Sequence, residues 1–207
     1  MSDEGYIKFR AQWEEAPPLP AKRLAGLIHW RGVMYLHGLI GAYPDGTGFG
    51  NISARWNSEG QFVISGSATG RLPQTDHRHY SLVTSFDLDQ NTLSCKGPVV
   101  ASSESMSHAV IYQTCREVNA VVHVHHLALW EKLLHAVPTT DKGATYGTPE
   151  MARSIIFLLK NTNLREQKIF VMEGHREGIF TFGNDLQEAT EKILSFDPMV
   201  GEPKLNT

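Results

Sequence analysis

The sequence predicts an α/β sandwich built around a largely antiparallel sheet. Helical and strand patterns are mixed along the chain, without the regular strand–helix–strand alternation that builds a parallel sheet. Strand patterns also occur as close pairs separated by short turn sequences, which is typical of antiparallel hairpins. A third observation is the buried strand pattern of residues 119–126, which follows one helical pattern and precedes another.

Composition indicates one globular domain and excludes several classes of partner. The 207 residues are 41% hydrophobic and 20% charged, enough to bury a core without disulfide bonds. A net charge of −3 provides no basic field, so we expect neither nucleic acid nor a membrane surface as a partner. No segment approaches the ~20 apolar residues of a membrane helix. Cys95 and Cys115 lie far apart, and residues 1–6 resemble no leader, so we expect free thiols and a cytoplasmic location.

The chain divides into three parts. Residues 1–20, which are rich in proline at their end, are expected to form an N-terminal arm on the surface or on a neighbouring subunit. Residues 21–196 form the predicted domain, and residues 197–207 form a loose C-terminal tail. Apolar residues at helical spacing predict a first helix from Ala21 to about Leu36, and a glycine-rich loop follows at residues 43–50.

Hairpins, helices and further strands follow this loop in order. A helix is expected to begin at Ser102–Glu104, before the strand of residues 119–126. Thr148, Pro149 and Glu150 are a typical helix start, with an N-cap, a proline and an acid in the first turn. Asn184 and Asp185 cap a last helix that extends to about Phe196. The predicted strand pairs are 51–56 with 62–64 and 82–88 with 92–96, and two further strands are expected at 169–172 and 179–182, on either side of residues 173–178.

Two histidines on the strand of residues 119–126 indicate a metal site. His123 and His125 are two residues apart, so a strand projects both from the same face. Imidazole is the commonest protein ligand for zinc and related metals. Glu104 begins the preceding helix, and His175 follows a glycine in the break between two strands, so the fold can bring both to this face. Three histidines and one carboxylate suit zinc, with the carboxylate replaceable by substrate.

Three clusters of glycine and hydroxyl residues indicate an anion site near the metal. Backbone amides in glycine-rich turns and at helix N-termini bind phosphate without a lysine. Each cluster alone is equally typical of an ordinary turn, so the indication depends on their occurring together. The clusters lie at residues 48–51, 65–70 and 102–103.

These motifs occur in an order that resembles the class II aldolase/adducin family. The resemblance covers about residues 25–195. Its segments are Gly50-Asn51-Ile52-Ser53-Ala54-Arg55, Ser102-Ser103-Glu104, Asn119-Ala120-Val121-Val122-His123-Val124-His125, Tyr146-Gly147-Thr148 and Gly174-His175.

The resemblance implies a fold, a reaction and a set of site residues. The fold would be a three-layer α/β/α sandwich, commonly assembled as a homotetramer with sites near subunit interfaces. The reaction would be aldol cleavage or formation in a small sugar phosphate, through a zinc-bound enediolate. Glu104 would be a ligand and a possible base. The implied zinc ligands are Glu104, His123, His125 and His175. The implied phosphate-binding residues are Gly50, Asn51, Thr69, Gly70, Ser102 and Ser103.

The chain departs from the family pattern at the proton donor. The family uses tyrosines in the loop after the histidine strand and near the C-terminus, and this chain has no tyrosine after Tyr146. His175-Arg176-Glu177-Gly178 also replaces the usual His-Gly. Local candidates for the acid are Tyr146, Asp141 and His126, each of which has an equally ordinary structural role. His108 could support Glu104 or only pack, and the other histidines, His29, His37, His77 and His79, are expected to be structural or solvated.

Two alternatives to a lyase remain open. A ketose-phosphate 4-epimerase of the same family would use the same metal ligands, so the ligand set does not separate the two reactions. A non-catalytic, adducin-like binding domain is the alternative from another functional class. The presence of all four ligand residues argues against it, whereas the missing tyrosines leave it possible.

Overall fold

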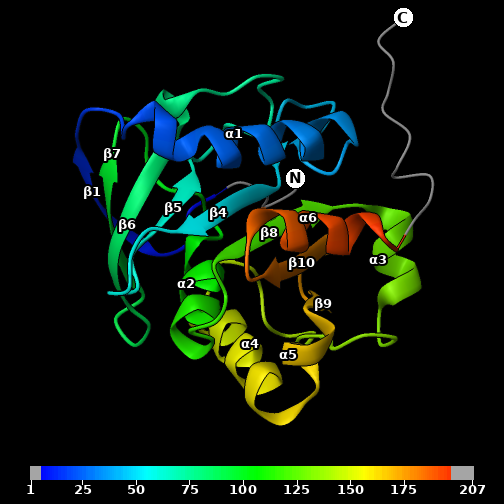
Figure 1. Ribbon diagram of the computed structural model, residues 1–207. Coiled ribbons are helices and arrows are strands. Elements are labelled where there is room, and N and C mark those ends of the chain that lie inside the picture. Colours follow the sequence, from blue (N-terminus) through cyan, green and yellow to red (C-terminus); the bar gives the residue numbers. More distant parts are fainter. Residues whose placement is uncertain (1–5, 197–207) are drawn as a thin grey trace, which may run out of the picture.

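The structure is a computed structural model that describes residues 6–196 (Figure 1). Within these residues, eight strands form one sheet in the order β1-β7-β6-β5-β4-β8-β10-β9. Neighbouring strands are antiparallel except β1 and β7, which run parallel, so the prediction of a mostly antiparallel sheet is confirmed. The strands are β1 Arg10–Glu15, β4 Asn51–Arg55, β5 Phe62–Ser65, β6 Tyr80–Asp87, β7 Thr92–Gly97, β8 Ala120–His125, β9 Ile169–Val171 and β10 Gly178–Gly183.

Helices cover both faces of the sheet and make three layers, as predicted (Figure 1). On one face lie α1 Ala21–Leu36, α3 Leu127–Leu133 and α6 Leu186–Leu194, which pack on a core that includes Val122 and Val124 of β8. On the other face lie α2 Ser105–Thr114, α4 Pro149–Asn161 and α5 Leu164–Gln167, which share a second core with Val121. Shorter elements are β2 Gly41–Ala42, β3 Gly48–Phe49 and the 3-10 helix η1 His77–His79.

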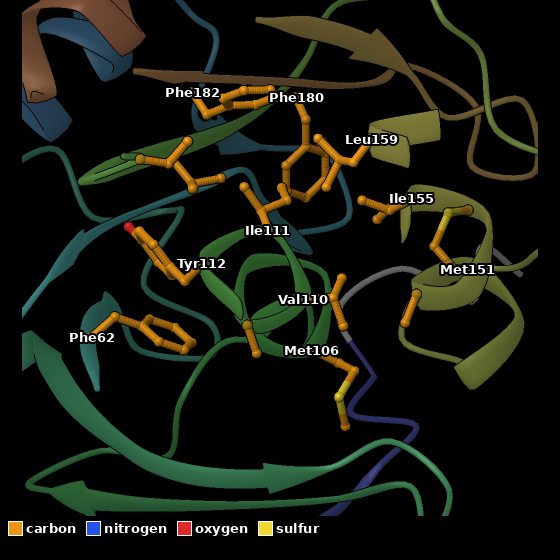
Figure 2. Packing of buried hydrophobic residues seen from close by; sticks show 14 of the residues in the cluster. Phe62, Met106, Val110, Ile111, Tyr112, Met151, Ile155, Leu159, Phe180 and Phe182 are labelled. Carbon is orange, nitrogen blue, oxygen red and sulfur yellow. The ribbon is translucent and has the colours of Figure 1, made fainter. Parts of the chain in front are cut away.

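The core between the sheet and the helices α2 and α4 shows to which face of the sheet His123 and His125 point. Figure 2 shows Met106, Val110 and Ile111 of α2 in one cluster with residues of α4 and of β10, with Ile111 nearest to Phe180. Because side chains alternate along a strand, residues 121, 123 and 125 of β8 face this layer, whereas residues 122 and 124 face the opposite one. The two histidines of β8 therefore point to the side from which α2 begins.

The predicted hairpins and helix caps are present. β4 pairs with β5 and β6 pairs with β7, both antiparallel. The side chain of Thr148 accepts a hydrogen bond from Met151 N at the start of α4, and Asp185 accepts from Glu188 N at the start of α6. Within residues 6–196, no helix has the length and apolar character needed to cross a membrane.

The expected N-terminal arm differs from the structure at residues 10–15. They form β1, an edge strand that extends the sheet along β7, instead of a separate arm. Their side chains are mostly exposed. Ile7, Phe9, Ala11 and Trp13 nevertheless alternate with polar residues, a strand signal that the interpretation of residues 1–20 as an arm did not use. Polar pairs across the edge, Gln12 with Ser94 and Glu14 with Lys96, accompany the backbone pairing. The expected tail at residues 197–207 lies outside the described residues.

Candidate metal centre and the loops around it

Strand β8 brings two histidines into a buried cluster with a third. His123 and His125 are 1% and 3% exposed, and His175 is 6% exposed. One ring nitrogen from each of the three lies within 4.8 Å of the others. A spacing of this size allows three nitrogens to bind one ion after small side-chain movements. The predicted association of the histidine pair with His175 is therefore present in the structure.

A glycine allows His175 to reach the cluster. His175 lies in the turn between β9 and β10, where its backbone N–H donates to Met172 O and its carbonyl accepts from Gly178 N. The preceding residue, Gly174, packs against the chain so closely that a Cβ there would lie 1.9 Å from Ala144 O. No side chain fits at this distance, so position 174 requires glycine.

Glu104 joins the histidines from the N-terminus of α2. Its side chain is buried, and its Oε1 lies 3.4 Å from His175 Nδ1. Its Oε2 accepts a hydrogen bond of 2.8 Å from Ser107 Oγ. The serine holds one oxygen, and the other is directed toward the histidines. All four residues predicted as metal ligands thus lie together: two from β8, one from the N-cap of α2 and one from a turn.

The electrostatic setting favours neutral imidazoles. Burial lowers the pKa of His123 and His125 well below the ordinary histidine value, and the neighbouring histidines lower the pKa of both further. Neutral imidazole is the form that binds metal. Among the described residues, His123 Nε2 is buried without a hydrogen-bond partner. A buried acceptor without a partner is costly, so the donor set fits a divalent metal ion bound here.

Asn51 of β4 supports His123 from the side. Its Nδ2 lies 3.3 Å from His123 Nδ1, and its Oδ1 is buried with no partner among residues 6–196. The two amide atoms differ only by rotation of the side-chain amide. With Oδ1 turned to His123, the amide oxygen would accept from Nδ1–H and leave Nε2 as the ligand atom.

The predicted phosphate loops converge beside Glu104. Five of the six predicted residues line one small pocket together with this glutamate: Gly50, Asn51, Gly70, Ser102 and Ser103. The sixth, Thr69, is next to Gly70, and its hydroxyl donates to Gly66 O. Two of these positions require glycine, one because of a close backbone contact and the other because of its backbone angle. A Cβ at position 70 would lie 2.7 Å from Phe49 O, and Gly50 has a positive φ of 75°.

A buried arginine that sequence patterns did not identify holds the middle loop. Arg31 of α1 is 1% exposed, and its guanidinium donates to the carbonyls of Thr69 and Gly70 at 2.8 Å and to that of Leu72. Arginine on a helix is normally exposed, so the residue type at position 31 did not indicate a buried role. A signal was present in its position, because residues 24, 27, 31 and 34 follow one apolar helix face.

A larger pocket of about 640 Å³ opens next to His175. Its lining includes Lys8, Tyr43, Tyr146, Arg176 and Glu177. Tyr43 was not identified as a candidate, because the loop of residues 43–50 has no periodic pattern that would fix a side-chain direction. The structure places its hydroxyl 2.8 Å from His125 Nδ1 and 2.9 Å from Glu177 Oε2.

The three candidate acids occupy different surroundings. The ring of Tyr146 stacks on His175, with centroids 4.7 Å apart, and its hydroxyl accepts from Tyr6 N. Asp141 accepts a hydrogen bond from Gly143 N within its own turn, and His126 caps α3 by accepting from Leu129 N. Only Tyr146 of the three lines the pocket beside His175.

The remaining histidines lie away from the cluster or pack against it. The side chain of His108 contacts Ser53 of β4. Its Nδ1 lies 2.7 Å from Ser53 Oγ, and burial lowers its pKa to about 3. His79 belongs to the capping box of η1 with Asp76. These contacts agree with structural roles.

The chain matches known proteins over most of its length. The family model described as class II aldolase and adducin N-terminal domain matches residues 43–200. L-fuculose phosphate aldolase from Methanocaldococcus jannaschii is 25% identical over 164 residues, which cover 73% of this chain and 81% of that protein.

Solved structures show the same fold at low sequence identity. An L-fuculose 1-phosphate aldolase superposes with a TM-score of 0.63 and 18% identity over 92% of both chains. A sugar-phosphate aldolase from Thermotoga maritima gives a TM-score of 0.64 and 15% identity, over 87% of this chain and 92% of that one. The extent of the family match, together with the fold and the order of the motifs, shows that the chain belongs to the class II aldolase and adducin family.

Proposed function

We propose that the chain is a zinc-dependent lyase that cleaves or forms a carbon–carbon bond in a small sugar phosphate. The observation that carries this proposal is the meeting of three buried histidines and Glu104 beside glycine- and serine-rich loops. The related enzymes named above act on fuculose phosphate and on sugar phosphates, which supports the same class of substrate here.

The proposed metal ligands are Glu104, His123, His125 and His175. When bound, a divalent metal supplies Lewis-acid stabilisation of negative charge that develops on the substrate. Zinc suits three imidazoles and one exchangeable carboxylate, although another divalent transition metal would fit the same donors.

Glu104 is proposed both as a ligand and as the base. Ser107 Oγ donates to Oε2, which leaves Oε1 as the oxygen directed at the histidines. With a metal held by these four residues, Oε1 would be the carboxylate oxygen that faces the bound ion and substrate. A carboxylate in that position can accept the proton at Oε1 while Oε2 stays held by the serine.

The proposed phosphate site is the small pocket of the three loops. Its residues are Gly50, Asn51, Thr69, Gly70, Ser102 and Ser103. The hydroxyls and backbone amides at the start of α2 favour an anion, because the N–H groups of a helix N-terminus point outward and carry partial positive charge. The pocket holds about 20 Å³, so we expect the loops to separate when phosphate binds.

The assembly and location are part of the same proposal. We expect a homotetramer, which is common in the family and places the sites near subunit interfaces. We also propose a cytoplasmic location. Light scattering coupled to size-exclusion chromatography measures the number of chains directly. A monomer that turns over substrate at full rate would contradict the proposed assembly without affecting the proposed chemistry.

The experiment is a screen of phosphorylated ketoses with the zinc-loaded protein. Fuculose 1-phosphate and rhamnulose 1-phosphate are assayed for aldehyde release, and ribulose 5-phosphate is assayed for epimerisation. Aldehyde release that requires the phosphate group would support the proposal. Epimerisation without release would replace the lyase with an epimerase. Turnover of unphosphorylated sugars alone would refute the phosphate site, and binding without turnover would support a non-catalytic domain.

A further inference from the structure

Two side chains outside the proposed ligand set form a hydrogen-bonded chain that ends on a histidine of the cluster. The hydroxyl of Tyr43 lies 2.8 Å from His125 Nδ1 and donates to Glu177 Oε2 at 2.9 Å. The tyrosine ring packs against Phe49, with centroids 4.8 Å apart, and Phe49 in turn stacks on His125. Residues from two distant parts of the chain, the loop of residues 43–50 and the turn at Glu177, thus fix one imidazole ring.

The chemistry of the three groups fixes the direction of each hydrogen bond. An ionised carboxylate only accepts, so the single hydroxyl hydrogen of Tyr43 is directed to Glu177. The tyrosine oxygen must then accept from His125, which places the histidine proton on Nδ1. The neutral ring keeps its lone pair on Nε2. A histidine held in this way binds a metal through Nε2.

The backbone at Glu177 indicates that its side chain has a use. Glu177 has a φ of 73°, in the left-handed region that costs free energy for a residue with a Cβ. Its backbone carbonyl accepts from His126 N, an interaction that a glycine would preserve. Glycine would adopt this conformation without strain, and the chain has glutamate there instead. The hydrogen bond to Tyr43 is the contact that glycine could not make.

We propose that Tyr43 and Glu177 are positioning residues that hold His125 as the Nδ1–H tautomer, with Nε2 directed to the metal. Their action passes through His125. The proposal rests on the metal centre of the proposed function. It gives a physical role to Glu177, one of the two residues that interrupt the usual His-Gly sequence.

The test uses three variants and two measurements. Tyr43→Phe keeps the ring and removes both hydrogen bonds. Glu177→Gly removes the carboxylate and relieves the backbone strain, whereas Glu177→Gln keeps an oxygen that can accept from the tyrosine. The tautomer of His125 is read from ¹⁵N–¹H NMR spectra of the metal-free protein, and the zinc dissociation constant is measured by competition with a chelator.

The proposal predicts a specific pattern across the variants. Tyr43→Phe and Glu177→Gly should weaken zinc binding by ~10- to 100-fold, as is typical when the hydrogen-bond partner of a metal-binding histidine is removed. Both should also mix the His125 tautomers. Glu177→Gly should nevertheless have an unchanged or higher melting temperature, which a purely structural role of the glutamate would not give. Glu177→Gln should keep most of the zinc affinity.

Matched controls test whether the effect is specific. Tyr35→Phe changes a tyrosine on α1, and Glu173→Gln changes a carboxylate that faces His135 in the same segment as Glu177. Neither should alter zinc affinity. Zinc affinity within about twofold of wild type in Tyr43→Phe, or an unchanged His125 tautomer in that variant, would overturn the proposal. A wild-type protein that binds no zinc would refute the proposed function, while the tautomer measurement would still decide the role of Tyr43.

Discussion

At the scale of single residues, the candidate site depends on close backbone packing as much as on its polar side chains. His175 reaches the cluster because the chain passes at Gly174 against the carbonyl of Ala144, where a Cβ would lie 1.9 Å from the oxygen. That neighbour is backbone, which cannot move aside in the way that a flexible side chain can. The geometry of a proposed ligand is therefore set by a residue that has no side chain.

Substitution of this glycine should be strongly destabilising. Gly174→Ala should lower the free energy of unfolding by about 2–4 kcal/mol, because the methyl group forces the turn away from residue 144. Gly32→Ala is the matched control. It lies in the interior of α1 with nothing within 4 Å of the added atom, so it should stabilise the protein by ~0.5–1 kcal/mol. Urea unfolding measures both, and equal small effects would contradict this account of the turn.

Residues that follow a periodic pattern were predictable from sequence, and residues in turns were not. His123 and His125 share a face because strands alternate, so their direction followed from spacing alone. The contacts of Tyr43 depend on the path of an irregular loop and on a left-handed residue at 177, and neither has a periodic signature. Glu104 and His175 were proposed as neighbours of the pair from their places at a helix start and in a break between strands, and the family resemblance implied the same set.

At the scale of secondary-structure elements, helix α1 supports a loop on which the proposed phosphate site depends. Arg31 extends from the buried face of the helix and satisfies three carbonyls between residues 69 and 72. Burial lowers the pKa of this arginine, but the guanidinium remains charged because an arginine side chain keeps its proton in proteins. The helix and the loop are therefore joined by a charge-assisted contact that is shielded from solvent.

Removal of that contact should affect both stability and phosphate affinity. Arg31→Leu should destabilise the protein by about 2–4 kcal/mol, because it leaves buried carbonyls without donors. Arg23→Leu is the control on the same helix. Its guanidinium bonds one exposed carbonyl, that of Trp56, so its loss should cost less than about 1 kcal/mol. Denaturant unfolding gives both free energies. Isothermal titration with inorganic phosphate measures whether the phosphate affinity of the loop is lost with the arginine. Equal costs in the two variants would refute the structural role of Arg31.

Elements with a strong pattern or cap were predicted, and weakly patterned ones were missed. The helix that begins at Pro149 has a threonine cap and a proline in its first turn, and both signals correspond to the observed start. The edge strand β1, which pairs with β7, is an exception, because residues 7–13 alternate apolar and polar types and the strand was nevertheless not predicted. The two-residue strands β2 and β3 and the four-residue helix α5 are too short to show a periodic pattern, and none of them was predicted.

At the scale of the whole molecule, buried histidines make stability depend on pH. Burial lowers the pKa of His108 to about 3, whereas its ordinary value is 6.5. Between these values the unfolded chain binds more protons than the folded chain does. The stability that neutral His108 preserves is therefore complete above pH 6.5 and is lost as the pH falls toward 3.

Replacement of His108 should reduce this acid sensitivity. His108→Gln loses the hydrogen bond to Ser53, so it should be less stable than wild type near neutral pH. Wild type should lose roughly 2–3 kcal/mol more than the variant on going from about pH 7.5 to about pH 4.5, because the variant has no proton to bind at this site. Urea unfolding across that range gives the difference. A constant gap between the two proteins would contradict a neutral, buried His108.

The most direct test of the whole account is the metal content of the purified protein, measured by mass spectrometry of the metals present per chain. The account predicts about one divalent transition metal ion per chain, with zinc preferred, and loss of most of it in His123→Ala. His29→Ala, which changes a histidine on α1, should keep the full content. Less than about a tenth of an ion per chain, or a content that His123→Ala leaves unchanged, would contradict the metal centre.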